Sequence, residues 1–266
     1  MTEHSPVRTA TSKGTARYDG RSGDELAALL NLARVVVFDE VTSTLDIVHE
    51  LGEAGAPPGT LVLADAQTAG RGRLRRSWRS DPGAGIWLTL LERPSSEDAF
   101  GVLALRIALA LAPALDAFAA SPVQLKWPND VYIDGRKLAG VLVEARWRGG
   151  RIDWLALGVG INVRPPDDLD VAALRAGSDR VSILSAIVPA LRAAAAKAGL
   201  LTADELAQFG ARDLALGRRC VAPTEGVVAG ISSDGALLVE GKDGRSASYA
   251  GSLVLDSDIH SLGGSA

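Results

Sequence analysis

The segment KWPNDVYIDGRKLAGVLVE, residues 126–144, carries a clear strand and turn signal. A strand over Val123–Trp127 is stopped by Pro128, and two further apolar runs, Val131–Ile133 and Lys137–Ala145, are separated by Asp134-Gly135. An Asp-Gly pair between two apolar runs is typical of a hairpin with a type I′ turn. The segment therefore predicts neighbouring strands with a cluster of polar side chains at the end of the first.

Apolar runs of strand and helix length extend the pattern on both sides of this segment. Short β-branched runs predict strands at Val35–Phe38, Leu61–Ala64, Ile86–Leu91 and Trp154–Val163. Apolar spacing predicts a helix capped by Thr42 or Ser43, and others over 95–118, Val181–Ala196 and Thr202–Phe209. From about Gly217 short β runs alternate with turns, which predicts a small all-β barrel.

These patterns divide the chain into four parts. Residues 1–24 lack apolar periodicity, and we expect a flexible lead-in there. We expect a main domain over 25–213, the small barrel over 214–258 and a loose tail over 259–266.

The bulk composition indicates a globular cytoplasmic protein. The 266 residues are 47% hydrophobic and 23% charged, with a net charge of −4. This mildly acidic balance argues against general nucleic-acid binding. The single cysteine, Cys220, permits no intrachain disulfide and fits a reducing compartment, and no apolar run is long enough to span a bilayer.

The most unusual segment is GRGRLRRSWR, residues 70–79, which we call the arginine loop. It holds five arginines within nine residues, and such a cluster is unfavourable unless an anion balances it. Guanidinium groups suit phosphate and carboxylate oxygens, and Gly70 and Gly72 let the backbone approach a ligand. A solvated basic loop or a nucleic-acid contact is the alternative. A Walker phosphate loop is excluded because the sequence has no Gly-Lys-Ser or Gly-Lys-Thr. A dinucleotide fingerprint is also excluded, because Val163 stands where the third glycine after Gly158-Val159-Gly160 would be.

Two further positions predict chemistry. The strand that ends at Lys126 places a cation beside Asn129 and Asp130, and Asp130 could hold magnesium, although a plain turn explains the same residues. Lys137 stands in an apolar strand, where we expect it to share a face with Ala139. A buried lysine needs an anionic partner, unless the side chain reaches water at an edge.

The three histidines and Cys220 lack the spacing of a metal site and any neighbour that would activate a thiol. We therefore expect catalysis by charge and positioning, without a protein nucleophile.

Taken together, these segments resemble the biotin–protein ligases. The resemblance rests on their order and spacing over most of the chain: Ser43-Thr44, Gln67, Gly70-Arg71-Gly72-Arg73 with Trp78, Lys126-Trp127-Pro128-Asn129-Asp130, the run Lys137–Glu144, and Gly158-Val159-Gly160-Ile161-Asn162.

The resemblance implies an α+β fold of the class II synthetase-like type, with a central mixed β-sheet flanked by helices and a C-terminal barrel similar to the Src-homology-3 fold. It implies that biotin and ATP form biotinyl-5′-AMP with magnesium, and that a lysine of a biotin carboxyl carrier domain then takes the biotinyl group. The carrier would belong to an acyl-CoA, acetyl-CoA or pyruvate carboxylase, with no nucleic acid or membrane as partner.

The resemblance also implies roles for individual residues. Catalysis falls to Arg73 and Lys137. Biotin binding falls to Ser43, Thr44, Gln67, Arg71, Gly72, Arg73 and Lys137. ATP or adenylate binding falls to Arg73, Arg76, Trp78, Lys126, Asn129, Asp130 and Asn162, with Asp130 as the magnesium ligand.

This sequence departs from the family pattern in two ways. Leu45 replaces the asparagine that usually follows the Ser-Thr pair, which removes one polar contact near biotin. About 34 residues precede the first strand, too few for a DNA-binding helix pair, so we expect no repressor activity. A lipoate or octanoate ligase and a non-catalytic module that binds an acidic partner are the competing predictions.

Overall fold

The computed structural model describes residues 16–94 and 96–258, and these form two β-sheets. The larger sheet has the strand order β1-β2-β3-β7-β6-β5-β4. Its strands are β1 (Arg34–Val41), β2 (Thr60–Gln67), β3 (Gly85–Glu92), β4 (Gln124–Lys126), β5 (Asp130–Ile133), β6 (Arg136–Arg148) and β7 (Arg151–Asn162). Strands β1 and β2 are parallel and every other neighbouring pair is antiparallel, which confirms the predicted mixed sheet.

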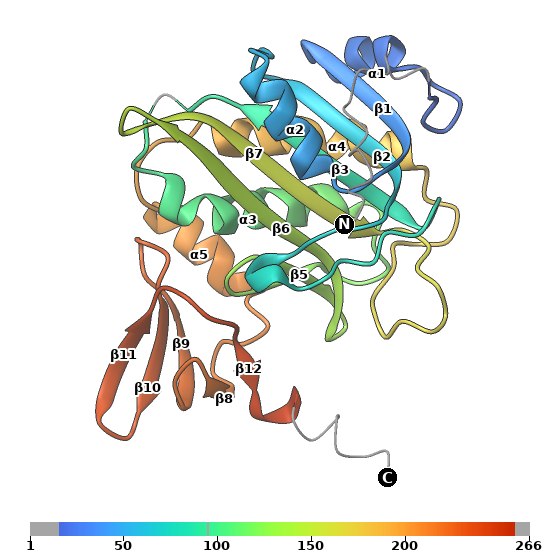
Figure 1. The fold of residues 1–266 in the computed structure, drawn as a ribbon. Helices are drawn as coiled ribbons and strands as arrows, with labels where there is room; N and C mark the ends of the chain where they lie inside the picture. The colour runs from blue at the N-terminus through green and yellow to red at the C-terminus, as the bar shows by residue number, and fades with distance from the viewer. Residues whose placement is uncertain (1–15, 95, 259–266) are drawn as a thin grey trace, which may run out of the picture.

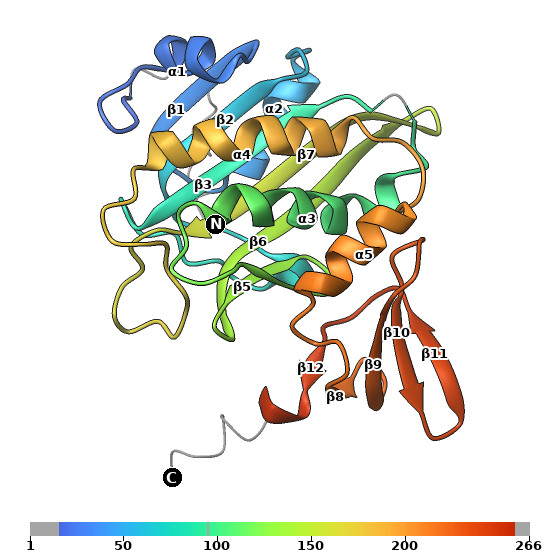
Figure 2. The same cartoon turned by 180° about the vertical axis from the view of Figure 1, so that it is seen from behind.

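Helices cover both faces of this sheet. Helices α3 and α4 lie side by side on the face seen in Figure 2, and α2 lies on the face seen in Figure 1. The helices are α1 (Gly23–Leu30), α2 (Thr44–Glu53), α3 (Leu103–Asp116), α4 (Arg180–Ala195) and α5 (Ala203–Arg212), with short 3-10 turns η1 (Arg73–Arg75) and η2 (Phe100–Val102). The predicted helix over 95–118 therefore begins later than expected, at η2. None of the helices in these described ranges has the length and apolar character needed to cross a membrane.

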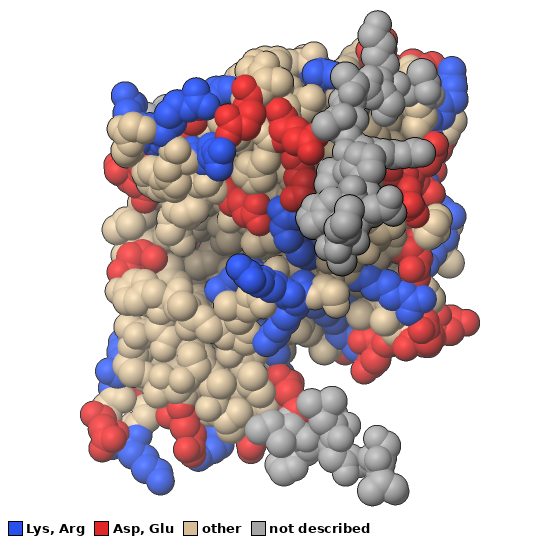
Figure 3. Space-filling model, viewed as in Figure 1, with Lys and Arg blue, Asp and Glu red and all other residues tan. Residues whose placement is uncertain are grey.

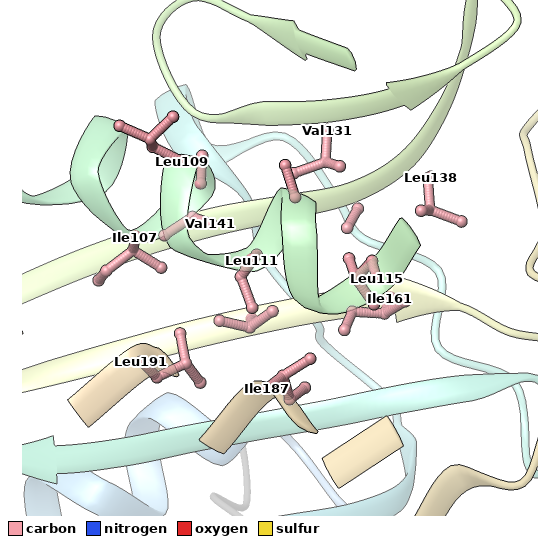
Figure 4. Close-up of a cluster of buried hydrophobic side chains, with 14 of the residues drawn as sticks. Ile107, Leu109, Leu111, Leu115, Val131, Leu138, Val141, Ile161, Ile187 and Leu191 are labelled. Carbon is pink, nitrogen blue, oxygen red and sulfur yellow. The ribbon is translucent and has the colours of Figure 1, made fainter. Parts of the chain in front are cut away.

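The apolar core divides between the two faces of the sheet. Along β2, Leu61 and Leu63 point into the large cluster under α3 and α4, whereas Val62 points into a smaller cluster under α2. This alternation follows from the two-residue period of a strand. Figure 4 shows the large cluster, in which side chains of α3 and α4 meet those of β5, β6 and β7.

The second sheet is antiparallel and follows α5, with the order β11-β10-β9-β8-β12. Its strands are β8 (Arg219–Ala222), β9 (Gly226–Ile231), β10 (Leu237–Gly241), β11 (Gly244–Ser248) and β12 (Val254–Leu255). The sheet agrees with the predicted small β-barrel domain. It is joined to the main sheet by the indole N–H of Trp127, which donates to the carbonyl of Gly235 over 2.9 Å.

The N-terminal part of the described chain corrects the expectation of a flexible lead-in. Residues 1–15 lie outside the described residues, but Tyr18 is buried in the main core, and α1 starts at Gly23 with a capping box. The guanidinium of Arg180 lies 4.3 Å from the centre of the Tyr18 ring and ion-pairs with Asp19 and with Asp65. The buried Tyr18 ring and the ion-paired Arg180 hold residues 16–24 on the main domain. Nothing in the sequence indicates this contact, because residues 16–24 have no apolar periodicity. The predicted tail 259–266 also lies outside the described residues.

Candidate functional site

One cavity of about 640 Å³ opens on the face of the sheet that carries α2. Basic side chains gather across the middle of this face in Figure 3. Every residue predicted for the site lines the cavity: Ser43, Thr44, Gln67, Arg71, Gly72, Arg73, Arg76, Trp78, Lys126, Asn129, Asp130, Lys137 and Asn162. The fold thus brings together residues from the N-terminus of α2, the ends of β2, β4 and β7, the hairpin β5–β6 and the arginine loop.

The floor of the cavity is made of glycines that lie opposite one another. Gly140 of β6 pairs with Gly160 of β7. A Cβ atom at position 160 would come within 2.6 Å of the indole ring of Trp78, and one at position 140 within 3.1 Å. The missing side chains therefore create the space in which Trp78 lies flat on the sheet. The Trp78 indole N–H is buried and has no hydrogen-bond partner among the described residues, so it is available to an oxygen of a ligand.

A polar group of side chains closes one end of the cavity. The backbone N–H of Thr44 donates to the side-chain carbonyl of Gln67 over 2.9 Å, and the Gln67 amide donates to the Ser80 hydroxyl over 2.8 Å. The hydroxyl groups of Thr44 and Thr89 lie 2.8 Å apart. These bonds fix the orientation of the Gln67 amide before any ligand arrives. Ser43 precedes α2 but makes no capping bond with its side chain, so the expected side-chain cap is absent, and Ser43 lines the cavity.

Cations line the other end of the cavity. The guanidinium of Arg73 donates to the Asn129 side chain over 3.3 Å, and Asn129 in turn donates to the Val141 carbonyl over 2.6 Å. Burial lowers the pKa of Arg73, with the nearby Arg76 acting in the same direction and Asp130 opposing them. Half-buried cations that repel each other favour binding of an anion at this end.

Lys137 lies on the cavity face of its strand, and the reason corrects the sequence-based expectation. Lys137 pairs with Tyr132 whereas Ala139 pairs with Val131, so Leu138 is an extra residue in a β-bulge. A bulge reverses the side-chain alternation. Lys137 therefore shares its face with Gly140, and a Cβ atom there would lie 3.5 Å from the Lys137 ammonium nitrogen, while Ala139 points into the core.

Lys137 also has the anionic partner that the sequence required of it. Its ammonium lies 2.8 Å from the Asp130 carboxylate and 5.1 Å from the centre of the Trp78 ring. Asn162 donates to the backbone carbonyl of Lys137 over 3.3 Å, which ties β7 to the start of β6. The predicted catalytic lysine, the acidic residue and the tryptophan thus form one cluster.

Comparison with known proteins identifies the family. The model of the Biotin/lipoate A/B protein ligase family matches residues 37–162, a range that contains every predicted site residue. The bifunctional ligase/repressor BirA of Bacillus spizizenii is 42% identical over 131 residues, which cover 49% of this chain and 40% of that protein. The biotin–[acetyl-CoA-carboxylase] ligase of Mycobacterium tuberculosis is 32% identical over 196 residues, which cover 69% of this chain and 72% of that protein. The chain belongs to the biotin–protein ligase family.

A solved structure of the family has a similar fold over most of this chain. The biotin protein ligase of Aquifex aeolicus in complex with biotin and ATP is 28% identical, with a TM-score of 0.65, and the match covers 83% of this chain and 97% of that one. The chain spans less than half the length of the bifunctional ligase/repressor relatives. Membership of the biotin–protein ligases, predicted from the motifs, is confirmed.

Several residues of this family member line the cavity although no motif indicated them. Thr89 and Tyr132 come from strand interiors, where nothing in the sequence separates a cavity side chain from a core one. The segment Ser252–Val254 and Asp258 reach the cavity from the second sheet, outside the matched range. The Asp258 carboxylate forms an ion pair with the Lys126 ammonium over 2.8 Å. The C-terminal part of the chain therefore completes the wall around the predicted nucleotide end.

Proposed function

We propose that this protein is an ATP-dependent ligase that converts biotin to biotinyl-5′-AMP and transfers the biotinyl group to a lysine of a biotin carboxyl carrier domain. The observation that carries the proposal is a single cavity with a polar hydrogen-bonding end and a cationic end. The names of the relatives support it, since one is a biotin–[acetyl-CoA-carboxylase] ligase and a solved relative holds biotin and ATP.

The polar end suits the ureido ring of biotin. A cyclic urea offers one carbonyl acceptor and two N–H donors, and the hydroxyls of Ser43 and Thr44 with the Gln67 amide offer both complements. Leu45 and Leu142 also line the cavity and provide an apolar wall for the aliphatic chain of biotin. In this proposal the valerate carboxylate points toward the cationic end.

The cationic end suits the first half-reaction. A carboxylate oxygen of biotin attacks the α-phosphorus of ATP, a new carboxyl–phosphate bond forms, and the bond to the β-phosphate breaks to release pyrophosphate. The two reactants repel each other because both are anions. Arg73, Lys126 and Lys137 would offset this repulsion and the charge that develops on the phosphate oxygens, since they are in place before the reaction.

The second half-reaction needs an accessible acyl group. A carrier lysine in its neutral form attacks the acyl carbon of biotinyl-5′-AMP, an amide bond forms, and AMP leaves with the bonding electrons. Until then the anhydride must be kept from water. The arginine loop, with Trp78 on the glycine floor, would cover it.

The nucleotide is placed by the remaining residues. Asn162, Arg76 and the unpaired Trp78 N–H lie along the cavity wall and would contact the adenylate.

The residues present also fit a magnesium ion. The described chain holds no cluster of three or more acidic, histidine or cysteine ligands, but magnesium that arrives with ATP needs only one or two carboxylates besides phosphate oxygens and water. Asp130 would hold it, and the ion would neutralise phosphate charge.

Biotin-dependent exchange of labelled pyrophosphate into ATP tests the first half-reaction. We expect exchange with biotin, none with lipoate, and transfer to a carrier domain that is lost when its acceptor lysine is replaced by arginine. Exchange that depends on lipoate would assign the chain to the other branch of the matched family, and absence of exchange with either acid would overturn the proposal.

The single cysteine supports a cytoplasmic location.

A further inference from the structure

A chain of four side chains leads from the core under α2 to the base of the arginine loop, and only its last member, Arg71, is among the predicted site residues. The Trp154 indole nitrogen lies 3.2 Å from Nδ1 of His49, and Nε2 of His49 lies 2.9 Å from the Glu144 carboxylate. Both oxygens of Glu144 accept from the guanidinium of Arg71 over 3.4 Å. The chain joins β7, α2, β6 and the loop.

The direction of these hydrogen bonds follows from their first member. An indole N–H can only donate, so Nδ1 of His49 must accept, and the ring proton of neutral His49 must sit on Nε2. Nε2 therefore donates to Glu144. The Trp154 side chain is held in place because it is buried and packs directly against Gly52. This contact is so close that a Cβ atom at Gly52 would lie 2.5 Å from the Trp154 ring. The core thus fixes both the tautomer and the orientation of His49.

Glu144 is ionised, and its negative charge holds the Arg71 guanidinium in a fixed orientation. The hydrogen bond from His49, followed by the contact with Arg71, outweighs burial and holds the pKa of Glu144 at about 2. Asp46 of α2 binds the same guanidinium from the other side over 2.7 Å. The loop turns back on itself at this point, since Arg71 pairs with Ser77 through a backbone bridge. Arg71 is therefore clamped where the loop leaves the sheet.

We propose that His49 and Glu144 are positioning residues, which hold Arg71 and so keep the base of the arginine loop closed over the biotin end of the cavity. This inference rests on the proposed function for its kinetic consequences, but its structural claim does not. If the loop is closed for only part of the time, the apparent Kd for the ligand equals the Kd of the closed form divided by the closed fraction. Saturating ligand restores the closed form. Loss of the anchor should therefore raise KM for biotin and leave kcat nearly unchanged.

The test compares three variants with a matched control. His49→Leu and Glu144→Gln break the chain, whereas His49→Gln keeps one acceptor for Trp154 and one donor for Glu144 on a single amide. Glu53→Gln is the control, because Glu53 also links α2 to β6, through Arg146 and Arg148, without contacting the loop.

Two readouts are measured on the 266-residue chain. The first is the rate of tryptic cleavage after Arg73, Arg75 and Arg76 in the absence of ligand, and the second is KM for biotin against kcat in pyrophosphate exchange. We expect both cleavage rate and KM to rise about tenfold in His49→Leu and Glu144→Gln, the value of one hydrogen bond to a charged group. His49→Gln should stay within about threefold of the native protein, and Glu53→Gln should match it.

The two proposals fail separately. Native protein without exchange would overturn the ligase proposal, while the cleavage rates would still test the anchor. Cleavage of His49→Leu at the native rate would overturn the anchor, as would equal cleavage of His49→Gln and His49→Leu. An equal rise in cleavage in the Glu53→Gln control would also overturn it, since it would indicate general loosening of α2 from β6.

Discussion

A methyl group at Gly160 should open the arginine loop without unfolding the protein. In Gly160→Ala the new Cβ would lie 2.6 Å from two atoms of the Trp78 indole and 2.9 Å from a third, well inside contact distance. The strand cannot yield, because Gly160 pairs with Trp87 on one side and Gly140 on the other. Trp78 must therefore leave the floor of the cavity.

The size of the effect follows from the overlap. Overpacking of this kind costs about 1–3 kcal/mol, which lowers the ratio of closed to open loop by about 5- to 150-fold. Gly140→Ala should have a smaller effect, because its nearest contact is 3.1 Å and the next is the flexible end of Lys137. Gly210→Ala serves as the control, since nothing lies within 4 Å of its Cβ position.

The assay measures three quantities for each variant: melting temperature, tryptic cleavage of the loop, and release of biotinyl-5′-AMP into solution. We expect no large fall in melting temperature in any variant, and a small rise in Gly210→Ala because alanine replaces a glycine within α5. Cleavage and release should rise in the order Gly210→Ala, Gly140→Ala, Gly160→Ala. Native cleavage and retention in Gly160→Ala would refute the view that Trp78 on the glycine floor closes the loop. A large fall in melting temperature would place the strain in the sheet instead.

Further predictions concern the site and the stability of the fold. Arg73→Ala should let the adenylate escape and biotinylate bystander lysines, detectable by blotting a mixture with an unrelated protein; blots that match the native enzyme would contradict it. Lys137→Ala should slow pyrophosphate exchange by about 100-fold or more with unchanged melting, because a charge at the reacting centre is lost. Burial alone would raise the pKa of Glu205, but hydrogen bonds from Arg106, Thr202 and Lys197 lower it to about 2. This carboxylate therefore contributes about 3 kcal/mol to the free energy of unfolding above pH 4.5, and the contribution is lost as the pH falls toward 2. Denaturant titration at several pH values should show this loss in the native protein and not in Glu205→Gln. Burial raises the pKa of Asp213 to about 6, so stability should fall by about 3 kcal/mol as the pH rises from 4 to above 6, and Asp213→Asn should remove that slope.

The hairpin and the arginine loop could be recognised from the sequence because their signals are local. Asp134 and Gly135 both have positive φ, as the expected type I′ turn requires. The arginine loop lies between two apolar runs that were predicted as strands, so its place in the chain could be read from its neighbours. The resemblance to the biotin–protein ligases supplied thirteen residues that line the cavity, but not Thr89, Tyr132 or the C-terminal residues.

Features that depend on packing had no such signal. Tyr18 stands in a polar, glycine-rich segment, but its ring is buried in the main core and lies under the guanidinium of Arg180, more than 150 residues away in the chain. His49 belongs to an ordinary amphipathic helix, and its link to Glu144 exists because α2 packs on β2, β3 and β7, which brings its His49 side chain within reach of the neighbouring strand β6. The C-terminal wall of the cavity likewise depends on how the second sheet meets the first.

The strands and helices could be predicted from the sequence because turn residues and apolar periodicity act over short stretches of chain, and the order and spacing of the motifs indicated the family and, through it, the polar residues of the site. The direction in which those residues point depends on the three-dimensional fold. One extra residue, Leu138, turns Lys137 from the core to the cavity, and the pairing of Gly140 with Gly160 makes a floor for Trp78. A turn sets the register of the strand pair beside it, but the bulge that shifts this register at Leu138 has no local signal in the sequence.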